Sequence, residues 1–421
     1  MNNDFIKFAN SFQEIAKPGL TNIRKLLSLL GNPQDGGKYI HVAGTNGKGS
    51  VCAFLQNILT LSGKRTGKYT SPNLVSVCER ISLDGKNISE CDMEKVLLSA
   101  KDAIKRGGGD FSPTQFEIWT AAALSYFNEQ NCNISVIETG LGGERDATNI
   151  IPPPLISVIT GISADHTEYL GNTLAEIAAA KAGIIKPCSK VVSAPQKDEA
   201  LKVLKNKCRA EGSELILPCI PESKGFDGIY EIFDYKGLKN IKCGLGGKHQ
   251  IENAVIAIEC ARLINIPDEI IKKGIETAKN IGRFEVISEN PLLIFDGAHN
   301  PDGITSLCHS LNRYFPGAHI NFVMAAMADK DYKKSFEIMN EYGFSKRSVI
   351  KTVAVEDNPR SETAENLAKS AAAAHFSAAP FPDIKSALSS AALPCGTKEN
   401  NDVTVVCGSL YLYKDLKNAG F

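Results

Sequence analysis

The chain has 421 residues, of which 43% are hydrophobic and 22% are charged, and its 47 basic and 47 acidic side chains give a formal net charge of zero. This length suggests two or three domains, on an expectation of roughly 150 residues each. The balanced charge argues against a dedicated nucleic-acid or membrane-surface binder, because such proteins need a large basic field. No apolar run approaches the length of a membrane span.

The N-terminus and the cysteines indicate the compartment. Residues 1–10 read MNNDFIKFAN and lack the basic flank and apolar core of a secretory signal. The twelve cysteines include no CxxC pair, and most lie in apolar runs. We interpret them as small buried hydrophobic side chains in a reducing compartment. We therefore expect a cytoplasmic protein.

Short apolar runs alternate with helical patterns along the chain. Val51, Phe54, Leu55, Ile58 and Leu59 follow the spacing of a helix with one buried stripe. Alternating strands and helices predict an α/β fold with a mostly parallel, doubly wound sheet. The runs that predict strands buried on both faces are residues 38–44, 133–140, 155–163, 291–297, 320–327, 348–355 and 402–409.

We place a domain boundary between residues 284 and 285. The string GRFEVISEN (282–290) is polar and reads as a loop, and a new β/α series follows it. The first domain then spans 1–284 and the second, smaller domain spans 285–421. Short β-like pieces in 186–248 predict a small side sheet on the first domain, which leaves two domains and not three.

The string HVAGTNGKGSV is the strongest chemical signal. A predicted strand runs into Gly44, Gly47 and Gly49, and a helix is expected to open at about Ser50. Glycines let the backbone approach a phosphate closely, N–H groups at the helix start face the anion, and Lys48 adds a positive charge. The string departs from the complete GxxxxGK[ST] pattern at two positions, because Val42 stands where the first glycine would be and Gly49 directly follows the lysine. Its strand–loop–helix setting nevertheless predicts a phosphate-binding loop.

Acidic and imidazole side chains follow two other predicted strands. Glu138 ends one apolar run, and Asp165 and His166 follow another. Because the carboxyl ends of parallel strands share one edge of the sheet, we expect the phosphate loop, Glu138 and His166 to converge there. A carboxylate and a neutral imidazole could hold Mg2+, with nucleotide phosphates completing its ligands.

Other polar residues have a functional and an ordinary interpretation. Lys181 lies on a predicted helix (173–186) after three alanines, so its side chain could reach inward, although most lysines are solvated. A further group of polar residues occupies strand ends, the linker and a helix start, where each could equally be a cap or loop residue. These are His249, Gln250, Asn253, Arg283, Asp296, His299 and Asn300.

Together, these strings resemble the folylpolyglutamate synthases, many of which are also dihydrofolate synthases, within the wider group of Mur-type ATP-dependent amide ligases. The resemblance runs from residue 19 to residue 412, and the ordered set is far more specific than any single string. The strings are GTNGKGS, TSPNL (70–74), ETGLGGERDATN (138–149), DHTEYLG (165–171), AAKAGIIKP (179–187), GRFE (282–285), FDGAHNPDG (295–303), DKD (329–331) and GSLYL (408–412).

The resemblance implies a P-loop ATPase domain followed by a smaller Rossmann-like domain, with ATP and Mg2+ as cofactors. Ser71, Glu138 and His166 would bind the metal, and Lys181 matches a lysine that is carbamylated in this family. His299 matches the histidine of its loop and, with Lys48 and Lys181, is a candidate catalytic residue. The candidate ATP contacts are Gly44, Thr45, Asn46, Gly47, Lys48, Gly49, Ser50, Asn253, Arg283 and Asp296.

The resemblance also implies a pterin or folate site. Three positions depart from the usual family strings: Asn73 replaces a histidine, Ala180 replaces a glutamate, and Glu144 interrupts the usual GGR. The last departure lies near the expected pterin site, so the folate substrate is left open. The residues matched to this site are Gly19, Leu20, Thr114, Phe116, Glu117, Arg145, Asp146 and Ala147.

The implied reaction joins L-glutamate to folate or dihydropteroate through an acyl phosphate, in a monomer without nucleic-acid or membrane partners. Domain closure would bring Arg283 and Asp296 to the nucleotide. Two alternatives stay open. Another Mur-type ligase acting on cell-wall precursors would share several strings, although TSPNL and the pterin-side strings argue against it. A nucleotide-dependent switch without ligase chemistry would explain the phosphate loop but not FDGAHNP.

Overall fold

The computed structural model describes residues 7–9, 11–12, 19–109, 111–391 and 402–421, so the expectations for Met1–Ile6 and Cys395 lie outside the described residues. The chain forms two compact units. The first comprises Met1–Ser223, Phe233–Cys243 and Ile251–Lys279, and the second comprises Lys224–Ile232, Gly244–Gln250 and Asn280–Phe421. The domain boundary that the sequence places between residues 284 and 285 stays a prediction.

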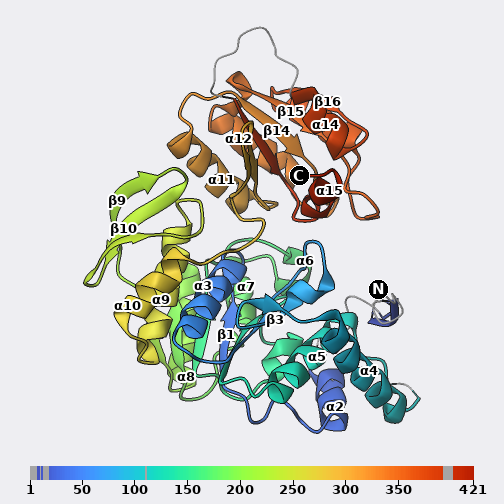
Figure 1. Cartoon of the computed structure of the whole chain (residues 1–421), viewed down its shortest axis with the longest axis vertical. Helices are drawn as coiled ribbons and strands as arrows, with labels where there is room; N and C mark the ends of the chain where they lie inside the picture. Colours follow the sequence, from blue (N-terminus) through green and yellow to red (C-terminus); the bar gives the residue numbers. More distant parts are fainter. Residues whose placement is uncertain (1–6, 10, 13–18, 110, 392–401) are drawn as a thin grey trace. The chain divides into compact units, whose positions relative to one another are not determined.

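The first unit is built on an eight-stranded sheet with the order β4-β3-β2-β5-β1-β6-β7-β8. Figure 1 labels β1 and β3 of this sheet. The six strands from β2 to β8 in this order are parallel, and β3 and β4 form an antiparallel edge. β1, β5 and β6 are buried along their whole length, which explains their unbroken apolar runs. The strands are β1 Tyr39–Ala43, β2 Thr66–Tyr69, β3 Ile81–Leu83, β4 Lys86–Asn87, β5 Ile134–Glu138, β6 Ile156–Ile159, β7 Lys190–Ser193 and β8 Glu214–Ile216.

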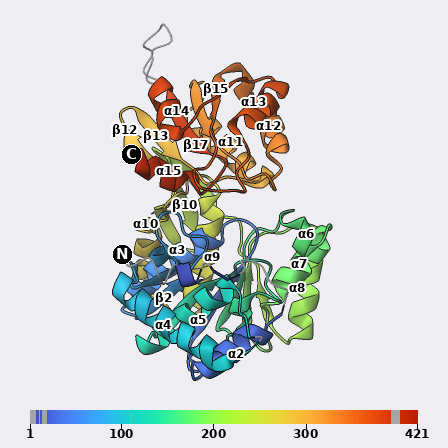
Figure 2. The ribbon, with the colours of Figure 1, turned by 90° about the vertical axis from the view of Figure 1, so that its right-hand side faces the viewer.

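Helices of the first unit pack in groups. α2, α4 and α5 contact one another, α3 packs on α10, and α7 lies beside α8 (Figure 2). α3 is buried on nearly all sides and not along one stripe, because Cys52, Ala53 and Gln56 are also buried. The helices are α2 Thr21–Leu29, α3 Lys48–Leu61, α4 Glu90–Gly107, α5 Gln115–Glu129, α6 Thr167–Leu170, α7 Leu174–Ala182, α8 Asp198–Ala210, α9 Gln250–Leu263 and α10 Asp268–Glu276, with 3-10 turns η1 Val77–Arg80 and η2 Ala147–Ile150.

The side sheet expected from 186–248 is only partly correct. β7 and β8 extend the main sheet, while β9 Glu222–Asp227, β10 Tyr230–Tyr235 and β11 Leu238–Lys242 form a separate sheet. Part of this sheet belongs to the second unit: Glu231 on β10 is fully buried and accepts hydrogen bonds from Arg313 and, at 2.8 Å, from the Tyr314 hydroxyl. A buried carboxylate is stable only when such donors satisfy it. The local sequence pattern does not show which residues supply these donors.

The second unit contains a six-stranded sheet with the order β12-β13-β17-β14-β15-β16, parallel except for β12. α11, α12 and α13 pack in sequence, and α14 contacts α15. The elements are β12 Glu285–Glu289, β13 Leu292–Phe295, α11 Pro301–Tyr314, β14 Ile320–Met324, α12 Tyr332–Glu341, η3 Phe344–Lys346, β15 Ser348–Thr352, α13 Ala364–Ala373, β16 Ser377–Pro380, α14 Ile384–Ala391, β17 Val403–Cys407 and α15 Leu412–Asn418.

The doubly wound α/β prediction is confirmed, as are all seven predicted strands. The loop predicted over 282–290 is wrong, because 285–289 form β12. An edge strand pairs on one side only and stays partly exposed, so it can include polar residues such as Glu285, Ser288 and Glu289.

The interpretation of the cysteines is confirmed for the seven buried ones but wrong for Cys91, Cys188 and Cys219, which are exposed; the eleven described cysteines are free thiols. In the described part of the chain, no helix is long and apolar enough to cross a membrane.

Candidate active site

The phosphate loop connects β1 to α3, which begins at Lys48, two residues earlier than expected. Gly44 and Gly47 have φ values of +153° and +91°, which side chains rarely adopt. A Cβ at Gly44 would lie 1.8 Å from Thr160 Oγ1, and one at Gly47 would lie 2.3 Å from Asn253 Oδ1. Both glycines are therefore required by the backbone and by the neighbouring side chains, and Asn253 is placed beside the loop.

Hydrogen bonds hold the loop in shape. The Lys48 ammonium donates to the carbonyl oxygens of Gly44 and Thr45, at 3.1 Å each. Thr45 N–H donates to Gly161 O at 2.8 Å, and the Thr45 hydroxyl exchanges two hydrogen bonds of 3.1 Å with the Ser163 backbone. The loop is thus fixed to the segment that follows β6, and the N–H groups at the start of α3 can face an anion.

Lys181 reaches the same loop from α7. Its side chain is buried, and its Nζ donates to Gly44 O at 2.8 Å. Burial, together with the nearby positive charge of Lys48, lowers the pKa of Lys181 to about 7, although Asp165 and Asp146 oppose the shift. A substantial part of this amine is therefore neutral at neutral pH. The ordinary interpretation, a solvated lysine, is wrong.

Glu138 and Ser71 lie together at the carboxyl edge of the sheet. Glu138 is buried at the end of β5, and Ser71 N–H donates to Glu138 Oε2 at 3.4 Å. His166 is in the left-handed region (φ +51°) and its Nε2 lies 3.9 Å from Asp165 Oδ2. Among the described residues, no three His, Cys, Asp or Glu side chains form a metal-binding cluster. The oxygens of Glu138 and Ser71 suit Mg2+ when phosphate oxygens supply further ligands.

On the expected folate side, Thr114 and Glu117 are engaged in protein contacts. Thr114 caps α5 and forms a capping box with Glu117. The buried Glu117 carboxylate also accepts Ile23 N–H at 2.9 Å near the start of α2. Glu117 therefore fixes the first turns of two helices. Leu20 precedes α2 as its N-cap, and Gly19 is exposed beside it.

The loop after β5 is folded around Asp146. This buried carboxylate accepts N–H groups of Gly140 and Leu141 at 2.9 and 2.8 Å, and N–H and hydroxyl groups of Thr148. Burial raises the pKa of Asp146, while these donors lower it. Of its neighbours, Ala147 is buried and Arg145 is exposed.

The aromatic ring of Phe116 packs beneath this loop. A Cβ at Gly140 would lie 2.6 Å from the Phe116 ring, whose centroid is 6.0 Å from that of Tyr69. The three departures from the family strings are also accommodated. Asn73 accepts a 2.7 Å hydrogen bond from Arg80, Ala180 O accepts Glu144 N–H at 2.8 Å, and the Glu144 side chain is exposed.

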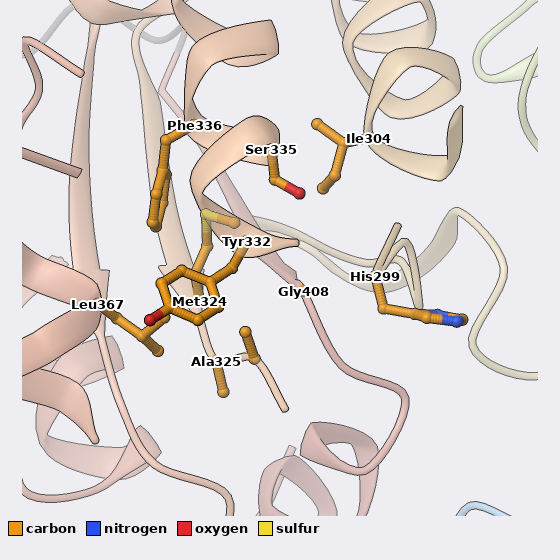
Figure 3. A pocket seen from close by; sticks show the side chains of 10 residues that line it. His299, Ile304, Met324, Ala325, Tyr332, Ser335, Phe336, Leu367 and Gly408 are labelled. Carbon is orange, nitrogen blue, oxygen red and sulfur yellow. The ribbon is translucent and has the colours of Figure 1, made fainter. Parts of the chain in front are cut away.

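The second unit contains Arg283, Asp296 and His299. Asp296 is buried and accepts N–H groups of Phe284 and Ala298, each at 2.8 Å; burial raises its pKa and Arg283 opposes the shift. His299 Nδ1 lies 2.8 Å from Gly297 O. His299 lines a small pocket with Met324 and Tyr332, and its ring points away from those two side chains (Figure 3).

Sequence reasoning missed the role of His41. It is fully buried on β1, and its Nε2 lies 2.8 Å from the Thr148 hydroxyl. Burial lowers the pKa of His41 to about 3, with Lys186 adding to the effect, so the ring is neutral at physiological pH. One polar residue in the middle of an apolar strand run was the signal that could have identified it.

Comparison with known proteins gives two family matches. Residues 42–261 match the Mur ligase middle domain, and residues 282–410 match the glutamate ligase domain of Mur ligases. The dihydrofolate synthase/folylpolyglutamate synthase of Bacillus subtilis is 34% identical over 423 residues, covering 95% of this chain and 94% of that protein.

Solved structures agree over nearly the whole chain. Mycobacterium tuberculosis folylpolyglutamate synthase, complexed with ADP and AMPPCP, has a TM-score of 0.89 at 27% identity, covering 99% of this chain and 98% of that one. Escherichia coli FolC, in complex with DHPP and ADP, has a TM-score of 0.85 at 26% identity, covering 99% and 96%.

The contacts of Glu117 predict a structural role. Replacing it with alanine leaves the N–H groups of Thr114 and Ile23 without their acceptor, so Glu117→Ala should lower the free energy of unfolding by about 1–3 kcal/mol. Glu117→Gln keeps one acceptor oxygen and should cost less. Urea unfolding measures both variants. Unchanged stability with a raised KM for folate would instead assign Glu117 to substrate binding.

Proposed function

We propose that this chain adds L-glutamate to folates and to dihydropteroate in a reaction driven by ATP. The chain belongs to the folylpolyglutamate synthase and dihydrofolate synthase family of Mur ligases. It is an ATP-dependent ligase that forms an amide bond. One observation supports placing the ligase reaction at this site. The buried Lys181 amine contacts the phosphate loop beside Lys48.

The reaction must first activate a carboxylate, which is a poor electrophile. An oxygen of the folate carboxylate attacks the γ-phosphorus of ATP, giving an acyl phosphate and ADP. The α-amino group of glutamate then attacks the acyl carbon, and inorganic phosphate leaves as the amide forms and the nitrogen loses a proton. Lys48 and the N-terminus of α3 bind and neutralise the phosphates, since phosphoryl transfer depends mainly on positioning and charge stabilisation.

Bound Mg2+ would neutralise phosphate charge, and the Glu138 carboxylate with the Ser71 hydroxyl would hold it. Lys181 contributes through its neutral amine, which can add to CO2: a C–N bond forms and the nitrogen loses one proton. The resulting carbamate is an anion next to the positive charge of Lys48. It takes the place of an amine whose protonated form is disfavoured by burial and by Lys48.

The folate side is proposed at the loop that follows β5. Asp146, Thr114 and Glu117 would shape it by holding the loop, α2 and α5, while Gly19, Leu20, Phe116, Arg145 and Ala147 stay candidates for contact. The roles of His166, Arg283, Asp296 and His299 rest on the resemblance and remain predictions. We also propose a cytoplasmic monomer, for which the free cysteines support the compartment.

An assay with purified protein tests the function. Dihydropteroate and tetrahydrofolate should each support ADP release that requires glutamate, and Lys48→Ala should abolish it because the phosphates lose their positive partner. Lys205→Ala, on the exposed surface of α8, is the control and should retain the activity. ADP release that needs no glutamate would favour a nucleotide-dependent switch, and turnover of nucleotide-sugar precursors would favour a cell-wall ligase. Near-normal turnover of Lys48→Ala would contradict the phosphate-loop assignment.

The carbamate at Lys181 predicts chemical rescue. Lys181→Ala should be inactive, and short carboxylic acids such as acetate should restore part of its activity, because they can place a carboxylate in the vacated space. Chloride at the same ionic strength should restore none. Steady-state ADP release measures the effect. Full activity of Lys181→Ala without added acid would remove the proposed role.

A further inference from the structure

We propose that His41 is a positioning residue for the ligase reaction. Acting through Thr148 and Asp146, it fixes the loop of residues 140–149, and this loop holds the C-terminal turn of α7 so that the Lys181 amine meets Gly44 O. The proposal rests on the role proposed above for Lys181.

The hydrogen bonds around the Thr148 hydroxyl have defined directions. The Thr148 hydroxyl has one proton and donates it to Asp146 Oδ1. It must therefore accept from His41 Nε2, which is 2.8 Å away, so His41 carries its proton on Nε2. Because both Asp146 oxygens are already met by donors from the loop, His41 completes a chain that runs from the central strand β1 into the loop.

The loop of residues 140–149 contacts the end of α7 directly. Glu144 N–H donates to Ala180 O at 2.8 Å, and Asn149 Nδ2 donates to Gly183 O at 3.1 Å. These carbonyls belong to the end of α7, where helical carbonyl groups lack partners within the helix. The packing leaves no room for adjustment: a Cβ at Gly143 would lie 2.7 Å from Lys181 O. A shift of the loop must therefore shift the backbone of Lys181.

Packing alone does not explain a histidine at position 41. His41 is 0% exposed, and its Nδ1 is among the buried polar atoms that meet no partner in the described structure. Leaving a polar nitrogen buried and unpaired costs free energy, whereas a leucine would be buried there without that cost. Stability alone thus does not favour histidine at this position, but delivery of one N–H to Thr148 requires it.

A matched pair of variants tests the proposal. His41→Leu removes the N–H and should lower kcat per nucleotide-binding site at least tenfold, with little loss of thermal stability. His41→Gln carries an amide N–H at about the distance of the imidazole Nε2 and should retain kcat within threefold. Thr148→Val, which breaks the same chain with a side chain of equal shape, should reproduce the loss and serves if His41→Leu does not fold.

A second readout follows Lys181 without requiring turnover. Trace acetylation with acetic anhydride, followed by peptide mass spectrometry, gives the reactivity of Lys181 relative to the exposed Lys197. We expect His41→Leu and Thr148→Val to change this ratio at least threefold and His41→Gln to leave it within twofold. If the wild-type protein shows no glutamate-dependent turnover, the proposed function fails while the labelling comparison still decides the positioning role.

Two patterns of results would overturn the positioning role of His41. If folded His41→Leu and Thr148→Val both bind nucleotide and match the wild-type kcat and Lys181 labelling within twofold, His41 has only a packing role. A fall in thermal stability with an unchanged kcat per nucleotide-binding site would overturn the proposal in the same way.

Discussion

The structure depends on the contact between a buried lysine amine and the first carbonyl group of the phosphate loop. Lys181 Nζ lies 2.8 Å from Gly44 O, and Lys48 donates to the same oxygen. Burial of Lys181, and then the positive charge of Lys48 at the same acceptor, lower the pKa of Lys181 and favour its neutral form. The loop therefore creates the conditions under which a lysine can react as a nucleophile toward CO2.

Close backbone packing makes this contact possible. Gly44 and Gly47 lie against Thr160 and Asn253, and Gly143 lies against the backbone of Lys181. Each glycine is placed where a Cβ would collide, with the side chains of Thr160 and Asn253 at the first two positions and with the Lys181 carbonyl oxygen at the third. Rigid support of this kind suits a reaction in which phosphoryl and amine groups must be held in register.

The sequence predicted those features that depend on buried strands. All seven predicted strands form, because strands buried on both faces of a parallel sheet are apolar throughout. The sequence prediction failed for β12, a partly exposed edge strand in which polar residues flank Val286 and Ile287. It also failed for the division of 186–248 between two sheets. The local sequence pattern does not show which strands pair when they lie far apart along the chain.

The candidate site was predictable where a local motif carries the chemistry. The glycine string predicted the phosphate loop, and Glu138 was correctly placed at the end of its strand. The burial of Lys181 was not predictable, since alanine neighbours do not show which way a helix faces. His41 was missed for a related reason: its partner Thr148 is 107 residues away, and only the fold brings them together.

The proposed chemistry depends on a reactive neutral amine at Lys181 beside the phosphate loop. Carbon-13 NMR of the protein in 13C-labelled bicarbonate tests for it directly. We expect one carbamate resonance that is absent from Lys181→Arg and present in Lys205→Arg. A wild-type protein that is active with glutamate and ATP but shows no such resonance, or one that persists in Lys181→Arg, would contradict it.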